Sequence, residues 1–245
     1  YETLHRENQV LVCAQSNTAV DWIAEKLVDR GVPVLRIGNP SRVNDKMLSF
    51  TYERRFEGHP AYTELWGIRK SIREMGNRMR KSSYSEREAA RSRINHLRER
   101  ATELEIQINE DLFSGARVIA STLVSSNHRI LTGRRFTTLF IDEAAQALEA
   151  ACWIAIRKAD RVIFAGDHCQ LPPTIKCIEA ARNGLEQTLM EKVAANKQET
   201  VSLLKVQYRM HQSIMQFSSE WFYQGELQAA PEAVSYTHLR AHETA

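Results

Sequence analysis

Residues 138–146 read Thr-Leu-Phe-Ile-Asp-Glu-Ala-Ala-Gln, an apolar run that ends in two adjacent acids and continues into small residues. The run is typical of a buried β-strand, and similar runs recur along the chain. The other predicted strands are Val10–Ala14, Val32–Ile37, Arg117–Ser121, Val162–Ala165 and Val201–Leu204, and a helical pattern covers Thr18–Arg30. Strands that are apolar throughout and alternate with helices predict an α/β fold, with a parallel sheet covered by helices on both faces.

The two acids, Asp142 and Glu143, follow their strand directly. Ligands of open α/β proteins bind at the carboxyl ends of the strands. A carboxylate at the position of Asp142 can hold Mg²⁺, and one at Glu143 can orient and deprotonate an attacking water. Acids also occur at such positions simply because they begin a helix, so the pattern alone leaves both interpretations open.

Two further motifs carry polar groups that suit phosphate. Val162–Ala165 leads into Gly-Asp-His-Cys-Gln at 166–170, where the neutral amide of Gln170 can sense a γ-phosphate by hydrogen bonding. An ordinary Gly-Asp turn is the structural alternative. The third motif is Gln-Tyr-Arg-Met-His at 207–211, in which the planar fork of Arg209 suits phosphate.

The alternation of strands and helices breaks between residues 55 and 113. Two apolar series with 3-4-3-4 spacing run through Leu65, Ile68, Ile72, Met75 and Met79, and through Ile94, Leu97, Ala101, Leu104 and Ile108. They predict an inserted antiparallel helical hairpin. Residues 69–100 hold eleven Lys and Arg against four acids, an excess of seven, although the net charge of the chain is only +3. This basic segment either follows a phosphate backbone or is the solvated face of a spacer.

Composition excludes several classes of protein. No apolar run approaches the roughly 18 residues that a membrane span needs, so we expect no membrane partner. The four cysteines have no zinc-ligand spacing, and we expect them to be reduced and neither Cys169 nor His168 to bind a metal. The start of the chain has no apolar signal core and residue 1 is not Met, which is typical of a fragment of an intracellular, cytoplasmic or nuclear, protein.

As an ordered set, these motifs resemble those of superfamily 1 helicases, in the up-frameshift-like branch, over residues 8 to 230. The matching stretches are Ala14–Asp21, Val118–Val124, Ile141–Gln146, Gly166–Pro172 and Gln207–His211. The resemblance implies a RecA-like motor domain of the P-loop NTPase type over 1–54 and 114–204, interrupted by the hairpin at 55–113. The start of a second motor domain would cover 205–233. Residues 234–245 continue no pattern and are expected to be a foreign tail.

The resemblance also implies roles for single residues. Asp142 would bind Mg²⁺, Glu143 would be the catalytic base, and Gln170 would couple the γ-phosphate of ATP to nucleic-acid binding. Arg209 would act as an arginine finger, with Tyr208 beside it at the nucleotide. The implied contacts to single-stranded RNA or DNA are Ser16, Asn17, Ser121, Thr122, Arg78, Arg80 and Lys81.

Ser16 and Asn17 would begin a helix whose amino end meets a phosphate, which is sound anion chemistry by itself, although simple helix capping explains the same residues. The expected protein is a monomeric ATP-dependent helicase or translocase with 5′ to 3′ polarity. No GxxxxGK[ST] loop occurs in the sequence, so we expect that loop upstream of residue 1 and expect this chain alone neither to hydrolyse ATP nor to unwind. The alternatives are a nucleic-acid clamp that does not cycle, a helicase–nuclease fusion, and a hairpin that docks a protein.

Overall fold

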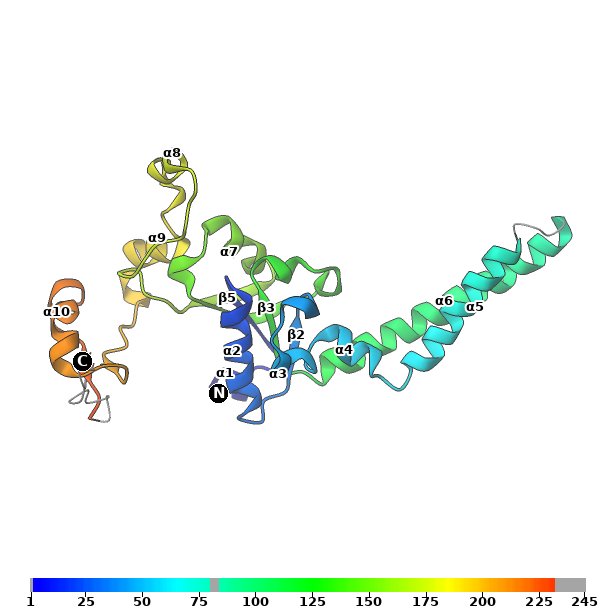
Figure 1. Ribbon diagram of the computed structural model, residues 1–245, viewed down its shortest axis with the longest axis horizontal. Helices are drawn as coiled ribbons and strands as arrows, with labels where there is room; N and C mark the ends of the chain where they lie inside the picture. Colours follow the sequence, from blue (N-terminus) through cyan, green and yellow to red (C-terminus); the bar gives the residue numbers. More distant parts are fainter. Residues whose placement is uncertain (1, 80–83, 232–245) are drawn as a thin grey trace, which may run out of the picture. The chain divides into compact units, whose positions relative to one another are not determined.

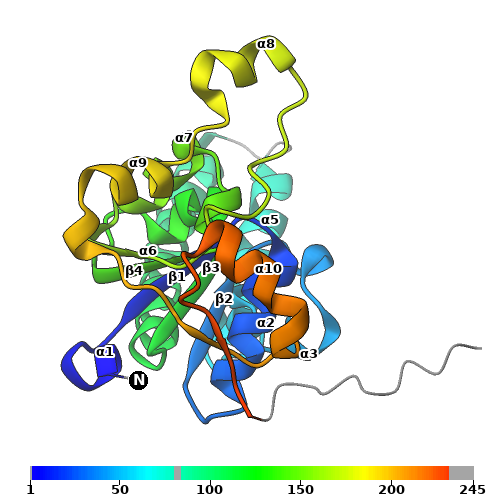
Figure 2. The same ribbon diagram turned by 90° about the vertical axis from the view of Figure 1, so that its left-hand side faces the viewer.

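A computed structural model of the chain describes residues 2–79 and 84–231, and its contacts divide into two compact units, Tyr1–Met190 and Glu191–Ala245. The first unit holds a five-stranded sheet in which every strand pairs in parallel with its neighbour. The strands, in the spatial order β2-β3-β1-β4-β5, are β2 (Val34–Ile37), β3 (Val118–Thr122), β1 (Val10–Ala14), β4 (Phe136–Asp142) and β5 (Ala159–Phe164). Figure 2 shows the first four of them next to one another. The predicted α/β fold is confirmed.

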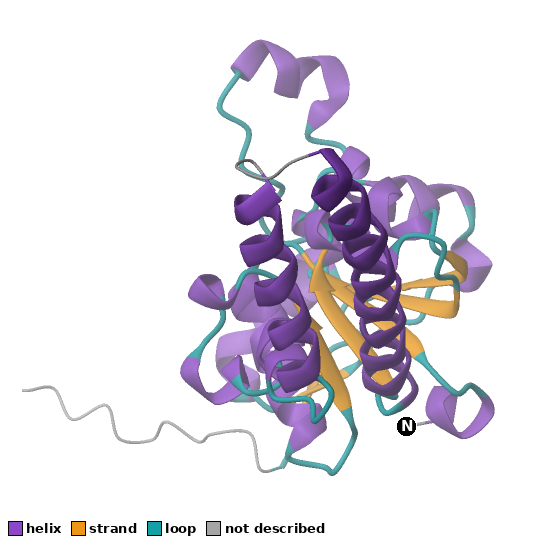
Figure 3. Ribbon diagram, turned by 90° about the vertical axis from the view of Figure 1, so that its right-hand side faces the viewer, coloured by secondary structure: helices purple, strands orange, loops and turns teal. Residues whose placement is uncertain are grey.

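Helices cover both faces of this sheet (Figure 3). The chain leaves β1 through α2 (Asn17–Val28) toward one edge, and leaves β4 through α7 (Glu149–Ile156) toward the other. Right-handed crossovers in opposite directions put their helices on opposite faces. Figure 2 shows α2 beside the strands. Its residues Val20 and Ala24 belong to the same buried cluster as Val12 and other strand residues.

The inserted helical hairpin is also confirmed. Helices α5 (Tyr62–Met79) and α6 (Tyr84–Ser114) lie side by side (Figure 1) and bury a cluster of their own, separate from the sheet. The cluster comprises Leu65, Ala101, Leu104 and Ile108, all taken from the two predicted apolar series. An ion pair between Arg100 and Glu64, at 2.9 Å, links the two helices on the outside.

The predicted strand over Val201–Leu204 is wrong. Residues 201–205 form no strand, and Leu204 is 86% exposed. Apolar residues become a strand only beside an edge that can pair with them, and the strand pair described in the second unit is β6 (Val206–Gln207) with β7 (Gln228–Ala229). The contacts divide the chain after Met190, whereas the sequence placed the second motor domain from residue 205; that boundary stays a prediction.

The remaining elements are short, apart from two helices of intermediate length, α9 (Leu189–Asn196) and α10 (Gln212–Phe222). The others are α1 (Glu2–Arg6), η1 (Pro40–Arg42), α3 (Asp45–Leu48), α4 (Tyr52–Glu57), η2 (Val124–Asn127), η3 (Arg129–Leu131), η4 (Ala144–Gln146), α8 (Ile178–Ala180), the π-helical turn η5 (Ala181–Leu185) and η6 (Gln198–Thr200). Within residues 2–79 and 84–231, none of the helices combines the length and apolar character that crossing a bilayer demands. The expected foreign tail at 234–245 lies outside the described residues.

Candidate active site and nucleic-acid interface

The candidate site lies along one edge of the sheet. Because all five strands are parallel, their carboxyl ends meet at the same edge. Ala14, the last residue of β1, is in register with Thr122 at the end of β3 on one side and with Asp142 at the end of β4 on the other. The motifs that follow these strands therefore stand next to one another, although more than a hundred residues separate the first from the others.

The turn after β4 holds the two acids in a fixed conformation. Asp142 is the last residue of the strand and is partly buried, and Glu143 is exposed. Glu143 adopts the left-handed conformation, with φ 53° and ψ 38°, which costs a residue with a side chain about 1–2 kcal/mol. Hydrogen bonds on either side hold it there: Ala165 N donates to Ile141 O at 2.8 Å, and Ala144 N donates to Ala165 O at 2.9 Å.

Gly166 brings the second motif into backbone contact with this turn. A Cβ atom at residue 166 would lie 3.0 Å from the amide nitrogens of both Ala144 and Ala145, and 3.1 Å from Met190 Sδ. A side chain cannot fit there unless the backbone moves, so glycine allows the two motifs to touch. This role of Gly166 was not among the predictions, although a glycine directly after an apolar strand can indicate a close approach of the backbone.

Asp167 organises the loop that carries Gln170. Its carboxylate accepts hydrogen bonds from Cys169 N at 3.0 Å and from Gln170 Nε2 at 2.8 Å. Gln170 is exposed, and its Nε2 keeps a second N–H for another acceptor. The ligand atoms of Asp167, His168 and Cys169 lie within 4.8 Å of one another, yet exposed groups of this kind are common without an ion. Our expectation that His168 and Cys169 bind no metal stays a prediction.

Ser16 and Asn17 begin α2, as predicted. Ser16 caps the helix, since its Oγ accepts a hydrogen bond from Ala19 N at 3.1 Å. Asn17 is partly exposed, and its Oδ1 accepts from Arg36 Nη2 at 2.9 Å. The first N–H groups of a helix have no partner within it, so this amino end, next to the end of β1, can receive a phosphate.

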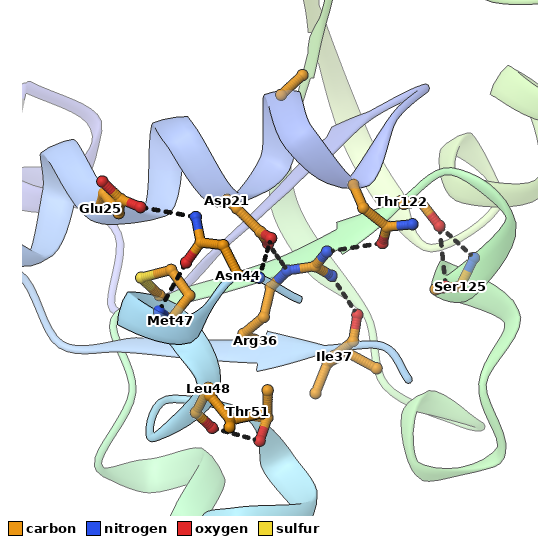
Figure 4. A network of polar contacts seen from close by, with 12 residues as sticks. Asp21, Glu25, Arg36, Ile37, Asn44, Met47, Leu48, Thr51, Thr122 and Ser125 are labelled. Atoms are coloured by element: carbon orange, nitrogen blue, oxygen red, sulfur yellow. Dashed lines mark hydrogen bonds and ion pairs between the residues drawn. The ribbon is translucent and has the colours of Figure 1, made fainter. Parts of the chain in front are cut away.

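The structure extends the predicted strand by one residue, since β3 ends at Thr122. Ser121 is fully buried inside β3, with its Oγ 3.4 Å from Cys13 Sγ. Its side chain is inside the protein because β3 is a central strand and helices cover both faces of the sheet. Thr122 ends the strand, and its Oγ1 donates to Ser125 Oγ at 2.8 Å and accepts from Ser125 N at 3.1 Å (Figure 4).

A buried ion pair that the sequence analysis missed supports this part of the edge. Arg36 in β2 is fully buried, and its Nε donates to Asp21 Oδ1 at 2.7 Å (Figure 4). The sequence pattern predicts Val32–Ile37 as an apolar strand, and it indicates no partner for Asp21. The pair could have been predicted from the Arg inside the apolar run, because a buried Arg needs an acidic partner and the preceding helix contains an acid.

The remaining candidates lie in other parts of the chain. Arg78 is exposed in the last turn of α5, whereas Arg80 and Lys81 lie outside the described residues. Tyr208 and Arg209 belong to the second unit and are exposed. Their turn is held by Gln207, whose Oε1 accepts from Arg209 N at 2.8 Å and whose Nε2 donates to Met210 O at 2.6 Å.

The acids of the β4 turn fit a magnesium ion. Proteins usually bind Mg²⁺ through one or two carboxylates together with substrate phosphates, and the strand end offers a partly exposed Asp142 followed by an exposed Glu143. Asp142 would hold the ion, and the ion would supply positive charge beside the phosphates.

Two family models match the chain, and each is described as an AAA domain. The first covers residues 1–177 and the second residues 185–244. The first match includes the whole parallel sheet and the inserted hairpin, and the second includes the turn that bears Arg209.

Several curated proteins are similar over nearly the whole chain. It is 35% identical over 234 residues to DNA-binding protein SMUBP-2 of Rattus norvegicus, and 32% identical over 229 residues to DNA polymerase alpha-associated DNA helicase A of Schizosaccharomyces pombe. It is 37% identical over 227 residues to the Regulator of nonsense transcripts 1 homolog of Arabidopsis thaliana. These alignments cover 93%, 93% and 91% of this chain, but 24%, 34% and 17% of the relatives. The chain thus spans about a third or less of their length.

Proposed function

The chain belongs to the superfamily 1 helicases of the up-frameshift-like branch and covers the first motor domain, and from this premise we propose that it is part of an ATP-driven motor that moves along single-stranded RNA or DNA. The observation that carries the proposal is the backbone contact between the turn of Asp142 and Glu143 and the loop of Gly166–Gln170. That contact puts two acids and an amide at one strand edge.

Glu143 is the catalytic base for hydrolysis of the γ-phosphate. Its carboxylate is exposed on a turn whose backbone is hydrogen-bonded on both sides to Ala165, directly after β5, so it can orient water without reorganising the backbone. General base catalysis by a placed carboxylate contributes roughly 10²–10⁴-fold to rate. Asp142, one residue earlier, holds the magnesium ion that accompanies ATP.

Gln170 reports the state of the γ-phosphate. One N–H of its amide donates to Asp167, which fixes the side chain, and the other N–H is available to a phosphate oxygen. Loss of the γ-phosphate would remove that acceptor, and the loop packed on the β4 turn would respond. A neutral amide suits this role because it adds no charge to the transition state.

Nucleic acid binds at the neighbouring strand ends. The amino end of α2 follows β1, and β1 pairs directly with β4. A phosphate at Ser16 and Asn17 would therefore lie one strand away from the hydrolysis chemistry, which gives a short path for coupling the two. Such contacts read phosphates rather than sugars, so the proposal covers both RNA and DNA.

Arg209 and Tyr208, which belong to the second unit, are assigned to the nucleotide because of their places in the Gln207–His211 motif. Arg209 acts as the arginine finger, which stabilises the charge of the transferred phosphoryl group, and Tyr208 contacts the nucleotide. The support for these roles is the exposure of both side chains on a turn that Gln207 braces.

The test is ATP turnover by the whole protein with and without a single-stranded oligonucleotide. We expect the nucleic acid to stimulate hydrolysis, and we expect Gln170→Ala to keep oligonucleotide affinity within about twofold while losing most of the stimulation. The 245-residue chain alone should show no turnover, since it holds no GxxxxGK[ST] loop. Oligonucleotide binding without any ATP turnover by the whole protein would instead identify a clamp that does not cycle.

A further inference from the structure

The side chain of Arg36, a residue of a buried strand, makes an extensive set of hydrogen bonds. Its guanidinium is fully buried and donates to three groups: Asp21 Oδ1 at 2.7 Å, Ile37 O at 2.6 Å and Asn17 Oδ1 at 2.9 Å. Figure 4 shows the guanidinium between Asp21 on α2 and the backbone of Ile37 on β2. The three acceptors come from the start of a helix, its second turn and the end of a strand.

Both oxygens of the Asp21 carboxylate also accept hydrogen bonds. Asp21 is 2% exposed, and its Oδ2 accepts a hydrogen bond from Asn44 N at 2.9 Å. The ion pair thus ties α2 both to β2 and to the loop that follows β2. A buried ion pair is a weak source of stability, because apolar residues of similar volume are often as stable. What the ion pair does provide is a fixed arrangement of the groups that it contacts.

One of those groups is the side chain of Asn17. An amide has one oxygen and one NH₂ group, and the oxygen of Asn17 is occupied by the Arg36 guanidinium. The NH₂ group therefore points away from Arg36. Asn17 is partly exposed and is the first residue of α2, so this donor stands at the amino end of the helix.

We infer that Arg36 is a positioning residue for nucleic-acid binding, which holds the Asn17 amide so that its NH₂ group, and not its oxygen, faces a backbone phosphate. The inference rests on the proposed function, since it assigns an orienting group to the same phosphate contact. Without the guanidinium the amide can rotate about its terminal bond, and its oxygen would then repel the phosphate. Arg36 itself never touches the nucleic acid, because it is buried.

Two substitutions separate this role from simple support of the fold. Asn17→Asp has nearly the shape of the amide and still accepts from Arg36, so the fold should remain, but it presents a carboxylate oxygen where the NH₂ group stood. Arg36→Lys keeps the charge opposite Asp21 but lacks the planar fork that reaches Asn17. The first changes the group that meets the phosphate, and the second changes what orients it.

The experiment measures binding of a labelled single-stranded oligonucleotide to the whole protein by fluorescence anisotropy, with thermal unfolding of each variant as the control. We expect Asn17→Asp to weaken binding about tenfold or more at an unchanged melting temperature. We expect Arg36→Lys to weaken binding about fivefold in the wild-type background and less than twofold in the Asn17→Ala background, since a residue that acts through Asn17 has nothing to orient once the amide is gone.

Three results would overturn the inference. One is wild-type affinity in Asn17→Asp, which decides the matter even if Arg36→Lys does not fold. Another is an equal loss from Arg36→Lys in both backgrounds, which would mean that Arg36 only supports the fold. The third is failure of the wild-type protein to bind the oligonucleotide, which would overturn the proposed function together with this inference. The other two results overturn the inference alone.

Discussion

Gly166 is the residue at which the two phosphate motifs meet, and its replacement tests their contact. Gly166→Ala places a methyl group 3.0 Å from two amide nitrogens of the backbone, which cannot move aside as a flexible side chain would. We expect a loss of about 1–3 kcal/mol in the free energy of unfolding, measured by urea titration, and a larger proportional loss of ATP turnover in the whole protein.

Gly67→Ala is the matched control for this substitution. Gly67 lies inside α5, and a Cβ atom there would meet nothing within 4 Å. Alanine should therefore stabilise the helix by about 0.5–1 kcal/mol and leave turnover unchanged. Equal effects of the two substitutions would contradict the close contact at Gly166.

Cys13 makes the stability of the sheet depend on alkaline pH. Burial raises the pKa of its thiol to about 12, and burial raises that of Cys152 to about 11, from the ordinary value of 9.0. The folded protein therefore keeps protons that the unfolded chain releases above pH 9. This contribution is complete below about pH 9 and declines as the pH rises toward 12, with a slope of about 1.4 kcal/mol per pH unit for each group.

Urea unfolding at about pH 8 and about pH 10.5 checks this prediction. The free energy of unfolding should fall less steeply with pH in Cys13→Ala than in the wild type. The same fall in both proteins would show that the Cys13 thiol is not the group that titrates.

Exposed Cys177 should react with a thiol reagent at neutral pH before the buried Cys13 and Cys152 do.

At the level of single residues, the sequence located the acids but not their surroundings. The place of Asp142 and Glu143 at a strand end could be predicted because the apolar run stops directly before them. Arg36 could not, because its partner Asp21 is fifteen positions away and only the fold brings them together. The burial of Ser121 could not be predicted either, because only the fold shows that helices cover both faces of its strand.

The hairpin is an element with its own core, so it should lose stability on its own. Leu104 is 2% exposed within the cluster between α5 and α6, whereas Ile106 is 52% exposed on the same helix. We expect Leu104→Ala to lower the protection of the α5 and α6 amides from hydrogen exchange by about 2–5 kcal/mol and to leave the sheet amides unchanged. Ile106→Ala should change neither by more than about 0.5 kcal/mol.

The basic end of the hairpin has two candidate partners, and charge reversal separates them. If Arg78, Arg80 and Lys81 contact phosphates, replacing all three by Glu should weaken binding of single-stranded nucleic acid. It should also reduce the slope of log affinity against log salt by about 2, since each phosphate contact on a single strand contributes about 0.7. Unchanged affinity and slope would favour a hairpin that docks a protein.

Helices and strands were predicted correctly where the apolar segment packs against, or pairs with, another segment of the chain. The two apolar series of the hairpin pack against each other, and the strands Val10–Ala14 and Thr138–Ile141 pair within one sheet. Val201–Leu204 has the same apolar character, but no strand edge receives it in the described part of the chain. A local pattern cannot report whether such an edge exists.

On the scale of the whole molecule, the proposed sites of hydrolysis and of nucleic-acid binding share one edge of one sheet. The ends of β3, β1 and β4 are adjacent and in register, and β5 continues the row. The parallel topology thus brings the amino end of α2 next to the turn of Asp142 and Glu143. A motor needs such proximity, because the loss of a γ-phosphate must change the grip on the strand.

Replacement of Glu143, the proposed catalytic base, tests this account most directly. In the whole protein, with single-stranded nucleic acid present, Glu143→Gln should lower ATP turnover at least about a hundredfold, while affinity for the nucleic acid stays within about twofold. Glu186→Gln, a change of an exposed Glu in the same unit, should leave both unaltered. Turnover near the wild-type rate in Glu143→Gln would contradict the assignment of the strand edge as the hydrolytic site.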